Sequence, residues 1–251
     1  MLASVASDVG RVREANEDYY CLCQLMTGCR PVLMAVADGM GGFEAGEVAS
    51  RLAVEETRRW LEVHAGGGED LQCALATACA AANERVYRVA LDTFGYSGMG
   101  TTLTAALWAA DRLVLAHVGD SRAYLVRKGR LQRLTADHSV VGAMVQNGEL
   151  GEREAMRHPQ RNLLTKALGT EPRLNIDIAE HAVCDGDIIV MCTDGLTNLV
   201  ASEEILEAIN GCRDLAGLGD QLVEMANARG GNDNITVLVA GIGRAGGGDG
   251  V

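Results

Sequence analysis

The 251-residue sequence lacks the features of several large protein classes. No run approaches the ~20 consecutive apolar residues of a membrane-spanning helix, and the N-terminal segment MLASVASDVGRVRE lacks the apolar core of a secretory signal. Basic residues are scarce: 22 Lys and Arg stand against 34 Asp and Glu, for a net charge of −12. This balance argues against nucleic acid or an anionic membrane as a partner. We expect a cytoplasmic protein, with a monomer as the default state.

The sequence also lacks the signatures of several other kinds of site. It contains no phosphate-binding GxxxxGK[ST] loop and no HExxH zinc helix. Cys79 and Arg85 have the Cys-x₅-Arg spacing of cysteine-based phosphatases, but CAAANER lies in an alanine-rich helical stripe without a phosphate-binding glycine loop. The eight cysteines lie mostly in apolar patterns, so we expect reduced core residues rather than a disulfide framework. Cys21, Cys23 and Cys29 lack the Cys-x-x-Cys pair or clustered histidines of a zinc site.

The order of the predicted elements favours an α+β fold. Strand-like runs fill 1–38, helical runs fill 44–91 and strand-like runs return through 101–128, which argues against a strictly alternating parallel sheet. Two one-sided apolar stripes mark helices in the middle block, and the glycines at 66–68 between them predict an antiparallel helical hairpin. The first stripe is Ala45, Ala49, Leu52, Ala53, Trp60 and Val63, and the second is Leu71, Leu75, Ala78, Ala82, Val86 and Val89.

Several strand-like runs are apolar on both faces and therefore need cover on both sides. These runs are 32–36, 113–116, 188–191 and 235–239. Lys128-Gly129 predicts a hairpin turn between 122–127 and 130–134, so neighbouring strands should be antiparallel. Two packed sheets with helices outside would satisfy both requirements.

Length and composition favour one compact domain. With 48% hydrophobic residues, the chain can bury a sizeable core, and we expect residues 1–243 to form a single domain. The segment from Thr135 to Gly169 is polar and lacks strand-like alternation, which predicts a surface insertion of the kind that often contacts ligands. The glycine-rich tail at 244–251 should be disordered.

Aspartates recur where apolar strands meet turns. They are Asp38 in VLMAVADGMGG, Asp120 in LVLAHVGDSR, Asp194 in IIVMCTDGL and Asp233 in GGNDNITVLV. A carboxylate at a strand end is held rigidly yet reaches solvent, which suits a metal ligand. Taken singly, each could be only a turn residue, as we expect for Asp185-Gly186. If the carboxylates converge, they would raise one another's pKa values and favour divalent cations, and oxygen-only ligands favour Mg²⁺ or Mn²⁺.

Convergence is suggested by a resemblance to the type 2C protein phosphatases, the metal-dependent serine/threonine class, and especially to their compact bacterial members. The matching motifs are SDVGRVREANED (7–18), VADGMGG (36–42), GTTLTAAL (100–107), AHVGDSRAYL (116–125), LTADHS (134–139), HPQRNLLTKALG (158–169), CTDGLTN (192–198) and DNITVLV (233–239). The resemblance implies a four-layer αββα sandwich, with two antiparallel sheets flanked by antiparallel helical pairs. It also implies hydrolysis of phosphoserine and phosphothreonine in proteins, opposing a serine/threonine kinase.

The resemblance also assigns metal ligands by position. Asp38 matches the ligand that bridges two metals, and Gly39 matches the residue that adds its backbone carbonyl. Asp194 and Asp233 match ligands of the first metal. Asp120 matches a residue that, in the bacterial members, binds a third and weaker metal. The region of Asn162 matches a further contributor to that third site. The expected cofactors are therefore two Mn²⁺ or Mg²⁺ ions, with a third at the weaker site.

Other matched residues explain how the reaction would proceed. Two ions can lower the pKa of a bridging water and place the hydroxide in line with the P–O bond, without a covalent intermediate. Glu17 and Asp18 match an acidic pair near the second metal, and Arg13 matches the phosphate-binding arginine, whose planar fork can hold two phosphate oxygens. Met40 stands where some relatives carry histidine, so a metal-bound water, or less readily His138, would protonate the leaving group.

The segment 139–162 resembles the flap of this family, a cover beside the metal site. We hypothesise that Arg153, Arg157 and Arg161 in it contact acidic or phosphorylated partners. Two other functions stay open at this point: a catalytically silent module that binds metal or phosphopeptide, and a phosphatase of a small metabolite or of a sigma-factor regulator. His117 lies in an apolar strand and is expected to be a core residue.

Overall fold

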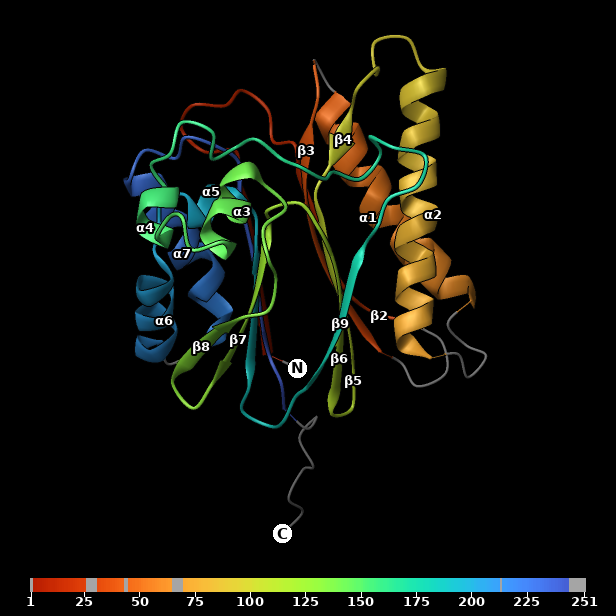
Figure 1. Cartoon of the computed structure of the whole chain (residues 1–251). Coiled ribbons are helices and arrows are strands. Elements are labelled where there is room, and N and C mark those ends of the chain that lie inside the picture. The colour runs from red at the N-terminus through yellow and green to blue at the C-terminus, as the bar shows by residue number, and fades with distance from the viewer. Residues whose placement is uncertain (1, 26–30, 43–44, 65–69, 213, 244–251) are drawn as a thin grey trace.

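Two antiparallel sheets face each other in the described part of the chain, and helices cover their outer faces (Figure 1). The computed structural model describes residues 2–25, 31–42, 45–64, 70–212 and 214–243. The α+β sandwich predicted from the sequence is confirmed. The glycines at 66–68, Cys29 and the tail at 244–251 lie outside the described residues. None of the described helices combines the length and apolar character of a membrane span.

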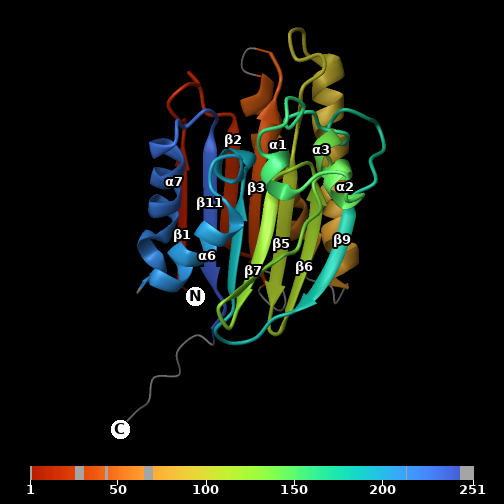
Figure 2. The ribbon, with the colours of Figure 1, turned by 60° about the vertical axis from the view of Figure 1, so that its left-hand side comes forward.

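The first sheet has the strand order β1-β11-β10-β7-β8. Its strands are β1 (Leu2–Asp8), β7 (Arg122–Arg127), β8 (Arg130–Arg133), β10 (Ile188–Cys192) and β11 (Ile235–Gly241). The hairpin turn predicted between β7 and β8 is confirmed: Lys128 and Gly129 have φ values of 50° and 71°, as two-residue hairpin turns require. The chain beside this sheet forms α5 (Asp194–Thr197), α6 (Ser202–Gly211), the short 3₁₀ helix η1 (Leu215–Gly217) and α7 (Leu218–Ala228). Figure 2 shows α7 beside β1 and β11.

The second sheet has the order β2-β3-β5-β6-β9, and the short strand β4 pairs with β3. Its strands are β2 (Asp18–Gln24), β3 (Val32–Met40), β4 (Gly100–Thr101), β5 (Leu103–Ala109), β6 (Arg112–Val118) and β9 (Asp177–Ala182). Helices α1 (Ala45–His64) and α2 (Leu71–Asp92) pack on its outer face. The polar insertion contains the short helices α3 (Val140–Gln146) and α4 (Glu152–Ala155), which lie near one end of the sandwich (Figure 1).

Alternation along each central strand divides the core into layers. In β3, Leu33 and Ala35 pack with α1 and α2, whereas Met34 and Val36 pack between the sheets against residues such as Leu238 of the first sheet. Successive side chains of a strand point to opposite faces. A strand that is apolar on both faces is therefore buried on one face by the helices and on the other by the facing sheet. This confirms the predicted need for cover on both sides.

The helical stripes are confirmed except at one end. Ala49 and Ala53 of α1, and Leu75 and Val86 of α2, are fully buried. Val63, assigned to the first stripe, is 66% exposed in the last turn of α1, so that assignment is wrong. Periodicity gives a direction around the helix axis, but it does not tell whether the core extends beneath the last turn.

Replacing Leu75 by alanine should destabilise the protein strongly. Leu75 is fully buried among α1, α2 and the second sheet, and removing such a side chain costs about 2–5 kcal/mol. The matched control is Leu91→Ala in the same helix, where the side chain is 68% exposed and the change should stay within about 0.5 kcal/mol. Urea unfolding followed by circular dichroism measures both, and equal free energies of unfolding would contradict the assigned core.

Candidate metal centre

The predicted aspartates converge on one cavity of about 260 Å³ at the end of the sandwich where β3, β6 and β10 finish. This is the upper end in Figure 1. Its lining includes most of the residues expected from the sequence: Arg13, Glu17, Asp38, Gly39, Asp120, Asn162, Asp194 and Asp233. Asp18 is absent from the lining, because it lies buried behind the cavity wall. Segments far apart in the sequence therefore bring their carboxylates to one place.

Asp38 is held by its backbone, which leaves its carboxylate available. Its N–H donates to Thr102 Oγ1 at 2.9 Å, and its carbonyl oxygen accepts from Thr101 Oγ1 at 2.9 Å and from the Thr102 N–H at 2.9 Å. Neighbouring strands thus fix the direction of the side chain, as a rigid metal ligand requires.

Glycines let the start of α1 approach β3 closely. A Cβ on Gly39 would lie 2.0 Å from the Gly46 carbonyl oxygen, and one on Gly46 would lie 2.6 Å from Glu17 Oε1. A side chain at Gly39 would force these backbones apart, and a side chain at Gly46 would displace the Glu17 carboxylate. The carboxylate of Glu17 therefore lies against the first turn of α1, where the helix dipole favours negative charge.

Two buried carboxylate oxygens at this centre have no hydrogen-bond partner among the described residues: Asp18 Oδ1 and Asp194 Oδ1. The second oxygen of each is satisfied, in Asp18 by the Thr193 hydroxyl at 2.8 Å and in Asp194 by Asn198 Nδ2 at 2.9 Å. Unsatisfied buried polar atoms are rare and unfavourable. A divalent cation with its water ligands would satisfy them, so the residues present fit a metal.

The electrostatics also favour a cation. Burial, followed by the charge of Asp18, raises the pKa of Asp38 well above its usual value. Burial raises the pKa of Asp18 to about 7 and that of Asp194 to about 6, and in both cases Asp233 adds repulsion. Burial and the charge of Asp194 likewise raise the pKa of Asp120 well above its usual value. Without metal, protons must offset this crowding; bound cations would replace them.

The described carboxylates do not already form a closed cage. No three acidic, histidine or cysteine side chains in the described part of the chain are arranged as a complete set around one ion. Oxygen-bound Mg²⁺ usually takes one or two carboxylates and keeps several waters. The open cavity suits that kind of coordination better than the all-protein sites of structural zinc.

Arg13 lies at the rim, on a loop that Asn234 holds at both ends. Its Nη2 donates to Asp233 Oδ2 at 2.9 Å, and its side chain is 49% exposed. Asn234 Nδ2 donates to the carbonyl oxygens of Val9 and Ala15, both at 2.9 Å, and its Oδ1 accepts from the Glu17 N–H at 2.8 Å. One amide therefore fixes the loop that carries the guanidinium.

Thr102, Thr193 and Asn234 are functional residues that the sequence interpretation missed. Each positions a predicted residue through the hydrogen bonds described above. A signal was present, because each is a small polar residue at or beside an apolar strand, and Thr193 and Asn234 also adjoin Asp194 and Asp233 in the sequence. Polarity at a strand position that should be apolar usually marks a satisfied, positioned hydrogen bond.

His138, the one side chain considered as a proton donor, does not line the cavity. Met40 lines the cavity but has no proton to donate. His138 is buried, with Nδ1 accepting from the Gly119 N–H at 3.2 Å and Nε2 facing Asp177 Oδ2 at 3.1 Å. His117 is a buried residue bonded to Thr104 and Ala136, which confirms its core assignment, and burial lowers its pKa to about 4.

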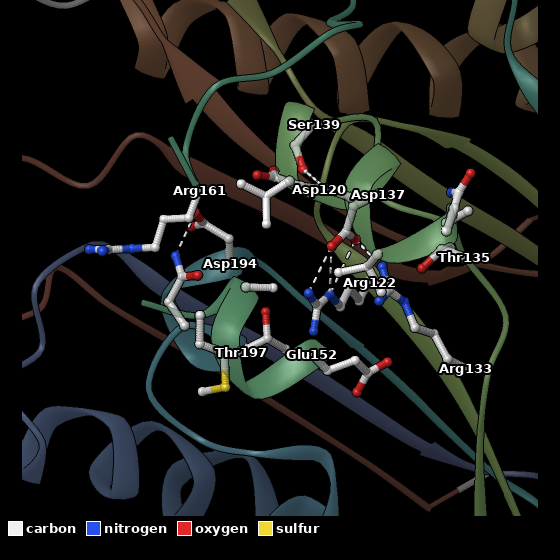
Figure 3. Close-up of a pocket in the computed structure, with 18 residues that line it drawn as sticks. Asp120, Arg122, Arg133, Thr135, Asp137, Ser139, Glu152, Arg161, Asp194 and Thr197 are labelled. Atoms are coloured by element: carbon white, nitrogen blue, oxygen red, sulfur yellow. Dashed lines mark hydrogen bonds and ion pairs between the residues drawn. The ribbon is translucent and has the colours of Figure 1, made fainter. Parts of the chain in front are cut away.

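A second cavity of about 240 Å³ adjoins the first through shared Asp120 and Asp194, and α3, α4 and α5 contribute to its lining (Figure 3). Arg122 Nη2 donates to Asp137 Oδ2 at 2.7 Å in its wall. Arg161 also lines it and is half-buried, with a buried Nε that has no partner among the described residues. Arg153 and Arg157 are instead exposed. The three arginines of the segment 139–162 therefore differ in their access to solvent.

Comparison with known proteins identifies the family. The family model for protein phosphatase 2C matches residues 11–239 of this chain. The chain belongs to the protein phosphatase 2C family. The serine/threonine phosphatase stp of Listeria monocytogenes is 38% identical over 241 residues, which cover 95% of each protein.

Solved structures of protein phosphatase 2C relatives share the fold. The Mycobacterium tuberculosis serine/threonine phosphatase PstP/Ppp has a TM-score of 0.84 at 38% identity, covering 96% of this chain and 98% of that chain. The catalytic domain of the phosphatase PstP in complex with two manganese ions has a TM-score of 0.83 at 37% identity, covering 96% and 97%. A close relative with this fold therefore holds divalent cations.

Manganese should stabilise this protein phosphatase 2C member more at pH 8 than at pH 5. The raised carboxylate pKa values mean that the metal-free folded state holds protons that the unfolded chain has released, so its stability falls as pH rises from about 4 through about 6 and 7. At pH 8, Mn²⁺ at 100 times its Kd should add about 2.7 kcal/mol and raise the Tm by roughly 5–10 °C. Differential scanning fluorimetry at both pH values, with chelator as reference, measures this.

The variant Asp38→Asn tests whether Mn²⁺ binds at the Asp38 cavity. Removing one charge should raise the Tm of the metal-free protein at pH 8 and abolish most of the Mn²⁺ shift. Asp92→Asn, at an exposed position of α2, should change neither quantity. An unaltered Mn²⁺ shift in Asp38→Asn would show that the cation binds elsewhere.

Proposed function

We propose that this chain is a metal-dependent protein phosphatase that hydrolyses phosphoserine and phosphothreonine monoesters of other proteins, with Mn²⁺ or Mg²⁺ held at the Asp38 cavity. The observation that carries the proposal is the convergence of four aspartates with Arg13 on one open cavity. Relatives named serine/threonine phosphatases support the substrate class. A serine/threonine kinase as counterpart, a monomer and a cytoplasmic location stay predictions from the sequence.

The proposal assigns the metals to particular side chains. Asp38 would contact both ions, with Gly39 adding its carbonyl, while Asp194 and Asp233 would hold the first. Asp120, with Asn162 across the cavity, would serve a third. The cations would supply charge neutralisation and an activated water at neutral pH. Glu17, whose carboxylate lies against the first turn of α1, and Asp18, which pairs with Asp38 across β2 and β3, would act through hydrogen bonds to the waters or ligands of the metals.

Arg13 would bind the phosphate and orient it. Its half-exposed guanidinium lies at the cavity rim and is anchored on Asp233, so its remaining N–H groups can reach a phosphate above the carboxylates. Arginine holds two phosphate oxygens in one plane, which a lysine ammonium cannot do. Bound cations and Arg13 together would make the local potential positive in a chain of net charge −12, and local potential governs capture of an anionic substrate.

The proposal extends to the domain organisation. Residues 1–243 would act as one phosphatase domain, and 139–162 as a flap over the site. The second cavity, lined by α3 and α4 of that segment, shares Asp120 and Asp194 with the first. A flap in this place would influence which substrates reach the metals.

A phosphopeptide panel assayed with Mn²⁺ tests the proposed function. We expect turnover of phosphoserine and phosphothreonine peptides and a loss of about a hundredfold or more in Asp38→Asn. Arg13→Lys should lower kcat/KM by about 10- to 100-fold. Arg11→Lys is the matched control, because Arg11 lies two residues away and is 57% exposed beside Glu224; it should keep full activity.

Each alternative function gives a different result in this panel. A silent binding module would bind phosphopeptide with Mn²⁺ and release no phosphate. A metabolite phosphatase would hydrolyse small phosphate esters far faster than any peptide. Either outcome would overturn the proposed function.

The flap arginines should affect protein substrates more than small ones. The double variant Arg153→Ala/Arg157→Ala should lower kcat/KM for an acidic phosphopeptide about fivefold, since exposed ion pairs contribute up to about 1 kcal/mol, and leave a small aryl phosphate unaffected. Arg85→Ala/Arg173→Ala removes the same charge from exposed positions outside the flap and should leave both rates unchanged. Equal losses on the two substrates would count against substrate contact by the flap.

A further inference from the structure

Two cysteines outside the metal centre lie side by side on strand β2. Cys21 and Cys23 are two residues apart, so they point to the same face of the strand, and both pack partly buried beneath α1 with Tyr19. Their sulfur atoms are 3.5 Å apart. Among the described cysteines, this is the one pair whose sulfurs are in hydrogen-bonding contact.

The surroundings make the two thiols unequal. The Cys21 thiol donates to the Cys23 sulfur, and this hydrogen bond, aided by the charge of Arg58 from α1, lowers the pKa of Cys23 despite partial burial and the nearby Glu62. The same hydrogen bond raises the pKa of Cys21. A thiolate is the reactive form of cysteine. Cys23 is therefore the nucleophile of the pair, and Cys21 is the thiol held next to it.

A disulfide between these positions is sterically accessible. Residues two apart in a strand have Cα atoms about 6.4–6.8 Å apart, and disulfides span Cα distances of about 4.4–6.8 Å. The pair lies at the upper limit of that range, so closing the bond would strain the strand. Strained disulfides have more oxidising potentials and are readily reduced again.

We propose that Cys21 and Cys23 form a redox-active dithiol that hydrogen peroxide or an organic hydroperoxide converts into a disulfide within strand β2. The Cys23 thiolate attacks one peroxide oxygen; an S–O bond forms, the O–O bond breaks, and the other oxygen leaves as water or alcohol after taking a proton. The Cys21 sulfur then attacks Cys23; the S–S bond forms, the S–O bond breaks, and the leaving hydroxide takes the Cys21 proton as water. The two sulfurs lose two electrons, which the peroxide gains.

The other described cysteines provide internal references. Cys79 and Cys192 are fully buried, and burial raises the pKa of each to about 12, so both should stay inert. Cys73 is exposed on α2 and reports the reactivity of an ordinary surface thiol. A site that merely reflects exposure would react no faster than Cys73.

Peptide mass spectrometry of the full chain tests the proposal. Trypsin does not cleave before Pro31, so both cysteines fall in the tryptic peptide 14–51, and a Cys29→Ser background removes the third cysteine of this peptide. A disulfide inside the peptide must then join Cys21 to Cys23. After brief treatment with about one equivalent of hydrogen peroxide and alkylation, the peptide should lack both alkyl groups, have lost two hydrogens, and regain alkylation after dithiothreitol. It should be consumed about tenfold faster than the Cys73 thiol.

Single variants test the assigned roles. In Cys21→Ser, Cys23 should be oxidised to a sulfenic acid that dimedone traps, whereas in Cys23→Ser the Cys21 thiol should react no faster than Cys73. Equal reactivity of the two single variants, or an unmodified peptide 14–51 when Cys73 is already oxidised, would overturn the proposal. Phenylarsine oxide bridges two adjacent thiols, so it gives a second measurement on the Cys29→Ser chain, in which Cys21 and Cys23 are both present. We expect tight one-to-one binding of phenylarsine oxide. Absence of this binding would also overturn the proposal.

Discussion

Crowding of buried carboxylates at the seam between the two sheets is the constraint on which this structure depends. Asp18 and Asp38 face each other in register across β2 and β3 of one sheet, while Asp194 follows β10 of the other. Asp18 and Asp194 are buried and Asp38 is half-buried. Burial and the charges of Asp18 and Asp194 raise the pKa of Asp38, and burial and the charge of Asp194 raise the pKa of Asp18. The sheets can therefore close at this end only when the charge is offset by protons or by cations. At neutral pH, cations are the effective partner.

This constraint explains why uncharged side chains hold the centre together. Thr102 and Thr193 bond to Asp38 and Asp18, and Asn234 fixes the Arg13 loop. Each contributes hydrogen bonds without a further negative charge, and without a cation that would compete for the carboxylates. Arg13 is the exception, and its position at the rim leaves it half exposed. Positive charge is thus kept on the solvent side of the cavity.

The layers of the fold could be read from the sequence because they depend on local patterns. Runs that are apolar on both faces, such as 188–191, predicted double burial, and Lys128-Gly129 predicted its hairpin. Strand β9 was not predicted, because it is an edge strand whose sequence, DIAEHA, alternates weakly and is only partly buried. Val63 was misassigned because a helical period carries no information on where the core ends.

The sequence predicted which residues form the candidate site, but it did not predict how deeply each of them is buried. The aspartates could be recognised by their places at strand ends, and the resemblance to a family supplied their convergence. The buried position of Asp18 beside Asp38 depends on the register of β2 against β3. Register between separate segments depends on packing that no single window of sequence contains. The half-buried position of Arg161, unlike Arg153 and Arg157, has the same origin, since it depends on how the insertion folds over the neighbouring cavity.

Helix α1 links the metal centre with the cysteine pair. Strand β2 lies at an edge of its sheet, so β3 holds it through hydrogen bonds on one side only, and α1 supports its outer face. The first turn of α1 contacts Glu17 through Gly46, and its later turns cover Cys21 and Cys23 and place Arg58 beside them. The position of the acidic pair at the start of β2 therefore rests on the same helix that sets the environment of the thiols.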